Sequence, residues 1–145
     1  QVGLAAPSDL AAGWVDDALT GRIPVIQREA GAGSQIAFEQ AVAAYGSADS
    51  SRAAVGPRAS GHAEAAWRCA TDGLVAVTIE PCALAMGLAF HPLELHVSEL
   101  WIGVDHIDHS SVRAFMDGLT GDRVQRRLDA VGGYDLTDCG TPIAA

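Results

Sequence analysis

Short apolar runs alternate along the chain with segments whose apolar residues recur every three or four positions. The runs are too short for helices and rich in β-branched residues, so they predict buried strands. These strands are predicted at residues 23–27, 52–55, 74–79 and 88–93, with a fifth, alternating segment at 95–104. The recurring segments predict amphipathic helices. These helices are predicted at residues 7–19, 35–45, 62–71, 81–86 and 111–131, the last bent or broken at Gly121.

The helical spacing also predicts which side chains face inward. In the segment at 35–45, Phe38, Val42 and Tyr45 share one face, and Ser34 is positioned to cap the helix. Strands that alternate with short helices indicate an α/β three-layer sandwich with a mainly parallel sheet. In such sheets ligands bind outside the carboxyl ends of the strands. The predicted strand ends that precede helix starts are at residues 28–29, 57–62 and 78–80.

Composition narrows the function classes. The chain has 145 residues, enough for one domain with its own core, and we expect a single domain over 1–145. Its formal net charge is −9, so direct contact with nucleic acid is not expected. All nine basic residues are arginine, which excludes lysine-based Schiff-base and phosphate-loop chemistry. The three cysteines lack a paired spacing and are expected to be reduced, and no apolar run is long enough for membrane insertion.

The stretch IPVIQREAGAGSQ is the strongest candidate for a binding site. A strand leads into a glycine-rich turn that opens a helix, where unpaired N–H groups and the helix dipole attract anions. Here Gly31, Gly33, Ser34 and Gln35 would contribute N–H and hydroxyl donors, and Arg28 would clamp a ligand oxygen. The alternatives are an ordinary turn with a capping serine and an Arg28–Glu29 ion pair.

The other two strand ends supply the remaining candidate ligand-binding residues. Ser60 and His62 stand at a helix start, where the positive end of the helix favours a neutral histidine. Thr78 and Glu80 border the third strand end. His62 could equally be a structural residue, and Glu80 could simply favour the helix that follows it.

We identify no catalytic residues, metal ligands or cofactor site. No serine lies in a Gly-x-Ser-x-Gly motif, and the carboxylates are scattered. The cluster His106, Asp108 and His109 lacks a second set of matching ligands. His91 and His96 are expected at the surface. We therefore expect a protein that is not an enzyme.

Three stretches in order resemble one known family. They are QREAGAGSQIAFEQAVAAYG, SGHAEAAWRCATDGLVAVTIEPCALAMGLAFHPLE and SVRAFMDGLTGDRVQRRLDAVGGYD. Together they resemble the periplasmic-binding-protein-like domain of type II topology. The closest variety is the molybdate-type solute-binding domain of bacterial molybdenum uptake and cofactor proteins, which is also attached to helix-turn-helix transcription regulators. The resemblance covers about residues 3–135.

The resemblance implies a lobe of a two-lobed ligand-binding protein. This chain is similar to the second lobe with the return strand and the C-terminal helix, and the first lobe would be missing. The family turn often has Arg followed by Gly-x-Gly-Thr-Arg, whereas here Gln35 replaces the last Arg. Glu29 and Glu80 near the predicted site weaken the expectation of a doubly charged oxyanion such as molybdate. The residues of the predicted site are still compatible with a small polar or zwitterionic ligand.

These observations support two functions of different classes. The first is a non-enzymatic domain that binds a small ligand, either a molybdate-like oxyanion or a small polar molecule, for sensing or uptake. The second is a truncated lobe that acts as a homodimerisation or protein-interaction module through an exposed strand edge and apolar helix faces. The cysteine pattern favours a cytoplasmic protein, whereas a transport receptor would be periplasmic or extracellular.

Overall fold

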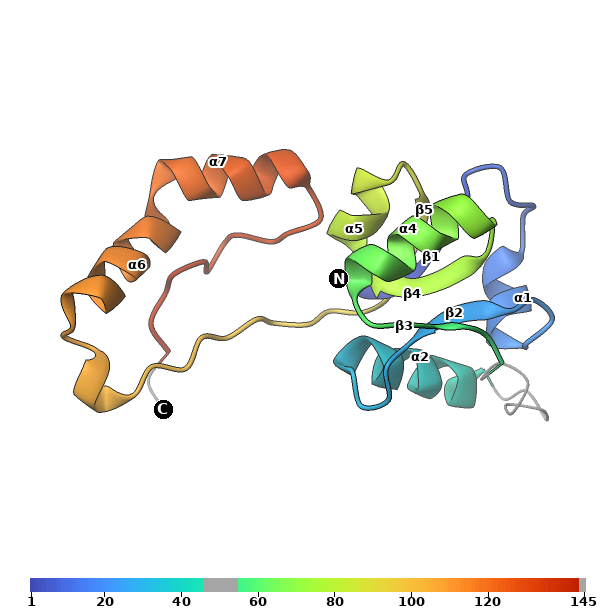
Figure 1. The fold of residues 1–145 in the computed structure, drawn as a ribbon, viewed down its shortest axis with the longest axis horizontal. Helices are drawn as coiled ribbons and strands as arrows, with labels where there is room; N and C mark the ends of the chain where they lie inside the picture. Colours follow the sequence, from blue (N-terminus) through green and yellow to red (C-terminus); the bar gives the residue numbers. More distant parts are fainter. Residues whose placement is uncertain (46–54, 144–145) are drawn as a thin grey trace. The chain divides into compact units, whose positions relative to one another are not determined.

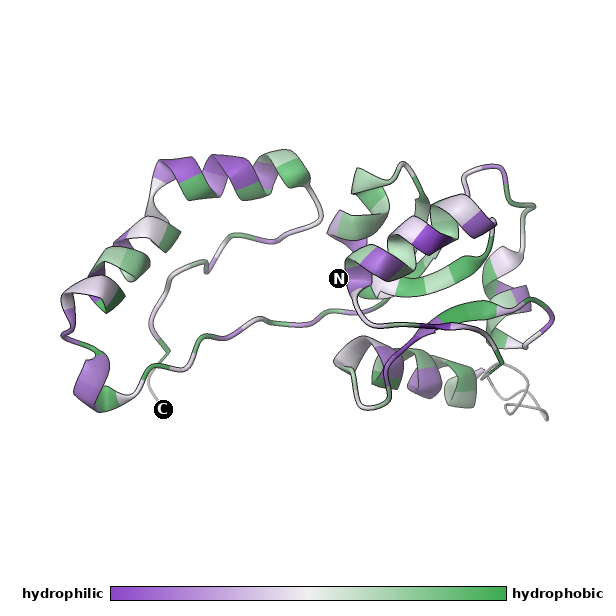
Figure 2. Cartoon of the chain, in the orientation of Figure 1, coloured by the Kyte–Doolittle hydropathy of each residue, from purple (hydrophilic) through white to green (hydrophobic). Residues whose placement is uncertain are grey.

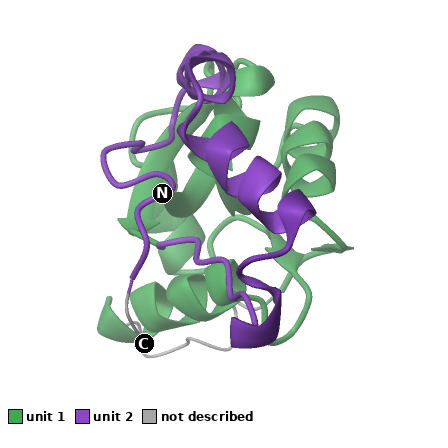
Figure 3. Ribbon diagram, turned by 90° about the vertical axis from the view of Figure 1, so that its left-hand side faces the viewer, with its two compact units in different colours: residues 1–96 green, residues 97–145 purple. Residues whose placement is uncertain are grey.

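The computed structural model describes residues 1–45 and 55–143. The chain divides into two compact units, Gln1–His96 and Val97–Ala145, which are coloured separately in Figure 3. We refer to them as unit 1 and unit 2. All but the last residue of the strand predicted at 52–55 lies outside the described residues.

Unit 1 is built on a five-stranded sheet in the order β3-β2-β4-β1-β5 (Figure 1). The strands are β1 (Val2–Ala6), β2 (Val25–Arg28), β3 (Arg58–Ala59), β4 (Val75–Ile79) and β5 (Ala89–Glu94). Strand β2 runs parallel to β3 and β4, whereas β1 runs antiparallel to β4 and β5. The sheet is therefore mostly parallel with one reversed strand, and the predicted α/β fold class is confirmed.

The reversed strand β1 is absent from the sequence-based prediction. All five of its residues are buried, and it lies between β4 and β5. Gly3 is required where β1 meets β5, because a Cβ at this position would lie 2.1 Å from the carbonyl oxygen of His91. The strand thus depends on a close backbone approach to a segment that is distant in the sequence.

Helices cover both faces of the sheet, as the three-layer prediction requires. They are α1 (Trp14–Leu19), α2 (Gly33–Ala44), α4 (His62–Asp72) and α5 (Glu80–Ala85). Alternate strand residues enter two separate cores: Val75 and Val77 pack with Phe38 of α2, whereas Ala76 packs with Ala65 of α4. In Figure 2 the central strand β4 is mainly hydrophobic, as expected for a strand buried on both faces.

The predictions for the first helix and for Tyr45 are wrong. The helix predicted at 7–19 begins only at Trp14, because Gly13 precedes it with a left-handed φ of 93° that interrupts any helix from Pro7. Pro7 instead starts a turn, with the N–H of Leu10 donating to its carbonyl. Tyr45, predicted to face inward, follows the last turn of α2 and is exposed.

Unit 2 contains a short 3₁₀ helix, η1 (Val104–His106), and two α-helices, α6 (Ser110–Thr120) and α7 (Asp122–Val131). The predicted break at Gly121 is confirmed. The strand predicted at 95–104 is not formed: residues 95–103 have no regular secondary structure. Its alternating pattern suits a strand, but a strand also needs a hydrogen-bonding neighbour, and here the apolar side chains remain exposed.

None of the described residues of unit 2, 97–143, is buried. Trp101 is 82% exposed and Phe115 is 51% exposed. Figure 2 shows hydrophobic and hydrophilic residues interspersed along α7, the pattern of a helix with one apolar face. Unit 2 therefore has helices with apolar faces and no core of its own within the described residues.

Candidate functional site

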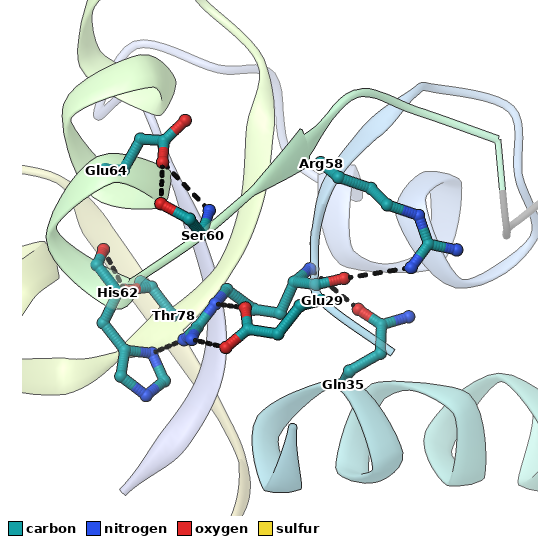
Figure 4. Close-up of polar contacts among 8 residues, drawn as sticks. Glu29, Gln35, Arg58, Ser60, His62, Glu64 and Thr78 are labelled. Atoms are coloured by element: carbon teal, nitrogen blue, oxygen red, sulfur yellow. Dashed lines mark hydrogen bonds and ion pairs between the residues drawn. The ribbon is translucent and has the colours of Figure 1, made fainter. Parts of the chain in front are cut away.

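The candidate site lies at the carboxyl ends of the parallel strands of unit 1. Strand β2 ends at Arg28, and helices α2 and α4 begin at Gly33 and His62. Because β2, β3 and β4 run parallel, their carboxyl ends lie at the same edge of the sheet. The fold thus brings together residues from all three predicted strand ends (Figure 4).

The Arg28 side chain is only 6% exposed and all of its described contacts are within the protein. Its Nε and Nη2 donate to Glu29 Oε2 and Oε1 at 2.9 and 2.8 Å. Its Nη1 donates to His62 Nδ1 at 2.5 Å. The hydrogen bond from Arg28 is the main cause that lowers the pKa of Glu29, so this carboxylate stays charged. Arg28 therefore forms an ion pair with Glu29. The sequence allowed this ion pair as the alternative to an Arg28 side chain that is free to clamp an anion.

His62 is held as a neutral ring with a defined tautomer. A guanidinium group can only donate, so His62 Nδ1 must accept and the ring proton must be on Nε2. Burial, followed by the positive charge of Arg28, lowers the pKa of His62 to about 4. The neutral state agrees with the sequence-based prediction, although burial rather than the helix start is the main cause. His62 can therefore offer an Nε2–H donor.

At the glycine-rich turn, the serine does not have the capping role that was predicted for it. Gly31 adopts a left-handed φ of 83°, and Ala32 is the N-cap residue of α2, so the first N–H groups of this helix have no side-chain cap. Ser34 was predicted as the cap but is the second residue of the helix. The helix begins earlier than predicted because Gly33 already has a helical conformation.

Ser34 is the most unusual polar residue of the site. It is 3% exposed and lies on the same face of α2 as the core residues Phe38 and Val42. Among the residues that the structure describes, its Oγ is the only buried side-chain nitrogen or oxygen without a hydrogen-bond partner. A buried hydroxyl without a partner costs stability, about 1–3 kcal/mol, so its retention calls for an explanation.

Gln35 has a structural role in this arrangement. Its Oε1 accepts from the N–H of Arg28 at 2.9 Å, and its Nε2 donates to Gln27 Oε1 at 2.8 Å and Glu39 Oε1 at 3.0 Å. Gln35 thus links the start of α2 back to the end of β2 and sets the shape of the turn.

Three further predicted residues are engaged in local structure. The N–H and Oγ of Ser60 donate to Glu64 Oε2 at 2.9 and 2.6 Å, which stabilises the start of α4. Thr78 Oγ1 donates to the carbonyl of His62 at 2.9 Å and so joins β4 to α4. Glu80 begins α5, and its N–H donates to the carbonyl of Gln1. The described hydrogen bonds of these residues stabilise the local structure around the site. None of these bonds offers a donor to a ligand.

His96 is exposed, as expected, but it also has a neighbour that was not predicted: it follows β5, and its ring lies beside Gly33 of the glycine-rich turn. A Cβ added to Gly33 would be 3.0 Å from His96 Cε1 and 3.3 Å from its Nδ1. His96 Nε2 lies 3.2 Å from Glu94 Oε2, and the charge of His96 also acts on His62. No local pattern marks His96, because only the position of β5 in the sheet brings it to the turn.

The other candidate groups do not join this site. In unit 2, Asp108 pairs with Arg113 at 2.5 Å, and His109 Nδ1 accepts from the N–H of Ser111 at the start of α6. Within residues 1–45 and 55–143, no three His, Cys, Asp or Glu side chains lie close enough together to hold a metal ion.

All three cysteines are free, and burial raises the pKa of Cys69 to about 12. No helix in the described part of the chain has the length and apolar character needed to cross a membrane.

Comparison with known proteins identifies a family. A family model described as a PBP superfamily domain matches residues 3–120. Neither the curated proteins nor the solved structures contain a match. The matched range includes the strand ends, the glycine-rich turn and His96.

Proposed function

The chain belongs to the PBP superfamily, and on this premise we propose that unit 1 binds a small polar or anionic ligand at the start of α2. Domains of this superfamily typically bind small ligands and do not catalyse reactions, so the proposed role is non-enzymatic. The ligand would lie against the uncapped N–H groups of α2, between the β2–α2 turn and His62.

The observation that carries this proposal is the buried Ser34 hydroxyl without a partner. It belongs to the second residue of an uncapped twelve-residue helix, where the backbone N–H groups and the helix dipole favour an anion. A ligand oxygen at this position would satisfy both the hydroxyl and the first N–H groups. His62 Nε2–H would add a neutral donor from α4.

The charges near the turn favour a small polar ligand or singly charged anion over molybdate. Arg28 is paired with Glu29, so the arginine adds little uncompensated positive charge. Gln35 occupies the position where the family turn often has a second arginine, and its polar atoms are engaged within the protein. The free cysteines suit a reducing compartment and therefore a sensing role rather than uptake by an exported receptor.

The test is thermal denaturation of the full chain with formate, phosphate, sulfate, tungstate and molybdate, each added separately. A bound anion should raise the melting temperature, because it stabilises the folded state. Ser34→Val should remove this rise by filling the site. The matched control is Ser111→Val, at the second position of α6, which should retain the rise.

Amide NMR spectra would confirm that each variant is folded. Full ligand-induced stabilisation of a folded Ser34→Val variant would contradict the proposed site. A lack of stabilisation by every anion, together with unchanged amide signals of Gly33, Ser34 and Gln35, would contradict anion binding itself.

A second function is supported by the exposed apolar residues of unit 2. We propose that Trp101, Phe115 and the neighbouring apolar residues form an interaction surface that a second copy of the chain covers. Light scattering should then show a dimer, and Trp101→Ser should shift it toward monomer. A monomer at all concentrations tested would contradict this role.

A further inference from the structure

The Arg28 side chain connects two other side chains of the candidate site. Its Nε and Nη2 donate to the Glu29 carboxylate at 2.9 and 2.8 Å, and its Nη1 donates to His62 Nδ1 at 2.5 Å (Figure 4). All three guanidinium nitrogens are therefore engaged, and the side chain is only 6% exposed. This leaves Arg28 little surface with which to touch a ligand, so any effect of Arg28 on a ligand has to act through its neighbours.

The main chains of Arg28 and His62 are both held by side chains. Gln35 Oε1 accepts from the N–H of Arg28 at 2.9 Å, which joins the end of β2 to α2. Thr78 Oγ1 donates to the carbonyl of His62 at 2.9 Å, which joins β4 to α4. Because both ends of the Arg28–His62 hydrogen bond are anchored, this bond fixes the orientation of the imidazole ring.

This hydrogen bond also decides which ring nitrogen carries the proton. A guanidinium has donors only, so Nδ1 must accept and the proton of a neutral ring lies on Nε2. Nε2 has no hydrogen-bond partner within the described residues. Burial and then the charge of Arg28 lower the pKa of His62 to about 4, while Glu29 raises it and His96 lowers it to smaller extents. His62 therefore presents one neutral donor, Nε2–H.

We propose that Arg28 is a positioning residue, which Glu29 holds in place and which fixes the His62 ring so that Nε2–H donates to a ligand oxygen. This inference rests on the proposed function of unit 1 and deepens it. The donors that meet the ligand are then neutral N–H and O–H groups, because the charge of Arg28 is balanced by Glu29 within the protein. Such a site fits the oxygen of a small carboxylate.

The first test determines the tautomer of His62 by NMR of the ring nitrogens in the full chain without ligand. At about pH 7.5, above the ordinary histidine pKa of about 6.5, the ring should be neutral with its proton on Nε2. Arg28→Met keeps a long side chain but removes every donor. In this variant either nitrogen can carry the proton, and the pKa of His62 should rise because the charge of Arg28 lowers it.

The matched control is Arg22→Met, which removes a different ion pair of unit 1, the one between Arg22 and Asp17. It should change neither the tautomer nor the pKa of His62. Amide NMR spectra verify that each variant is folded. The tautomer of the unmodified chain needs no variant, so it tests the proposal even if Arg28→Met does not fold.

The second test measures formate binding through the amide signals of Gly33, Ser34 and Gln35. Arg28→Met should weaken binding about threefold to tenfold, the effect of losing one well-placed hydrogen bond. His62→Phe keeps a ring but removes the donor, and it should weaken binding to a similar extent. In the His62→Phe background, Arg28→Met should cause no further loss, because changes at two residues that act through one contact are not additive.

The outcomes separate this inference from the proposed function. A proton on Nδ1 in the unmodified chain, or an unchanged tautomer and pKa of His62 in folded Arg28→Met, would overturn the positioning role. Equal weakening by Arg28→Met with and without His62 would mean that Arg28 acts on the ligand independently of His62, and it too would overturn that role while the binding site stands. If formate shifts none of the three amides, the proposed function fails, and this inference fails with it.

Discussion

Helices α2 and α6 are of similar length and both carry an apolar face, but only α2 is covered. In unit 1, Phe38 of α2 is 1% exposed and packs on the sheet, whereas in unit 2 Phe115 of α6 is 51% exposed. The two helices also start differently: His109 caps α6 with its side chain, whereas α2 has no side-chain cap. An amphipathic pattern therefore predicts a helix but does not say what, if anything, covers its apolar face.

The difference at the helix starts is the more useful one for function. The start of α6 is exposed and capped by its own neighbour, which satisfies one of its N–H groups. The start of α2 combines an absent cap with a buried hydroxyl that has no partner. The starts of α2 and α6 can thus be compared position by position. Substitutions at these positions test whether the start of α2 is a ligand site.

The largest expected difference is between the two phenylalanines. Phe38→Ala should lower the free energy of unfolding by about 3–5 kcal/mol, because it leaves a cavity in the core of unit 1. Phe115→Ala should change it by less than about 0.5 kcal/mol, because its ring is half exposed. Urea denaturation measures both. A comparable loss for Phe115→Ala would show that another polypeptide covers α6, which is the dimer proposed above.

A smaller effect of opposite sign is expected at Ser34. Without ligand, Ser34→Ala should raise the free energy of unfolding by about 1 kcal/mol, because it removes a buried hydroxyl that has no partner. The matched Ser111→Ala change in α6 should have little effect. Urea denaturation without added anions provides the measurement. Destabilisation by Ser34→Ala would mean that the hydroxyl is hydrogen-bonded in solution and would remove the main support for the site.

The last comparison concerns His62 and pH. Its pKa is lowered to about 4 in the folded chain, so the unfolded chain binds a proton at higher pH. The free energy of unfolding should therefore fall as the pH drops from about 6.5 to 4, and this contribution is complete above about 6.5. His62→Gln should reduce that slope, whereas His106→Gln in unit 2 should not. An unchanged slope in His62→Gln would show that His62 is not held neutral.

Local pattern predicted most of the elements of unit 1. Strands β2, β4 and β5 and helices α2, α4 and α5 begin and end within about two residues of their predicted limits, because hydrophobic periodicity and turn residues act over short distances. Strand β1 was not predicted. Its burial depends on insertion between β4 and β5, and nothing near Val2–Ala6 in the sequence indicates that insertion.

The candidate site was predictable only in outline. The rule that ligands bind at the carboxyl ends of parallel strands correctly indicated that Arg28 and His62 would meet. The rule could not predict the hydrogen-bond partners of these side chains: Gln35 holds the turn in place, and Thr78 holds α4 in place. It also could not find His96, which β5 brings to Gly33.

The sequence by itself determined the α/β fold class, the glycine-rich turn and the break at Gly121, because spacing and backbone conformation are local properties. Tertiary structure decided which polar groups are satisfied. It paired Arg28 with Glu29, held His62 neutral and left the Ser34 hydroxyl without a partner, since each depends on burial and on neighbours that the fold brings together. It also left the strand predicted at 95–104 unformed, because strand formation requires an adjacent strand as well as a pattern.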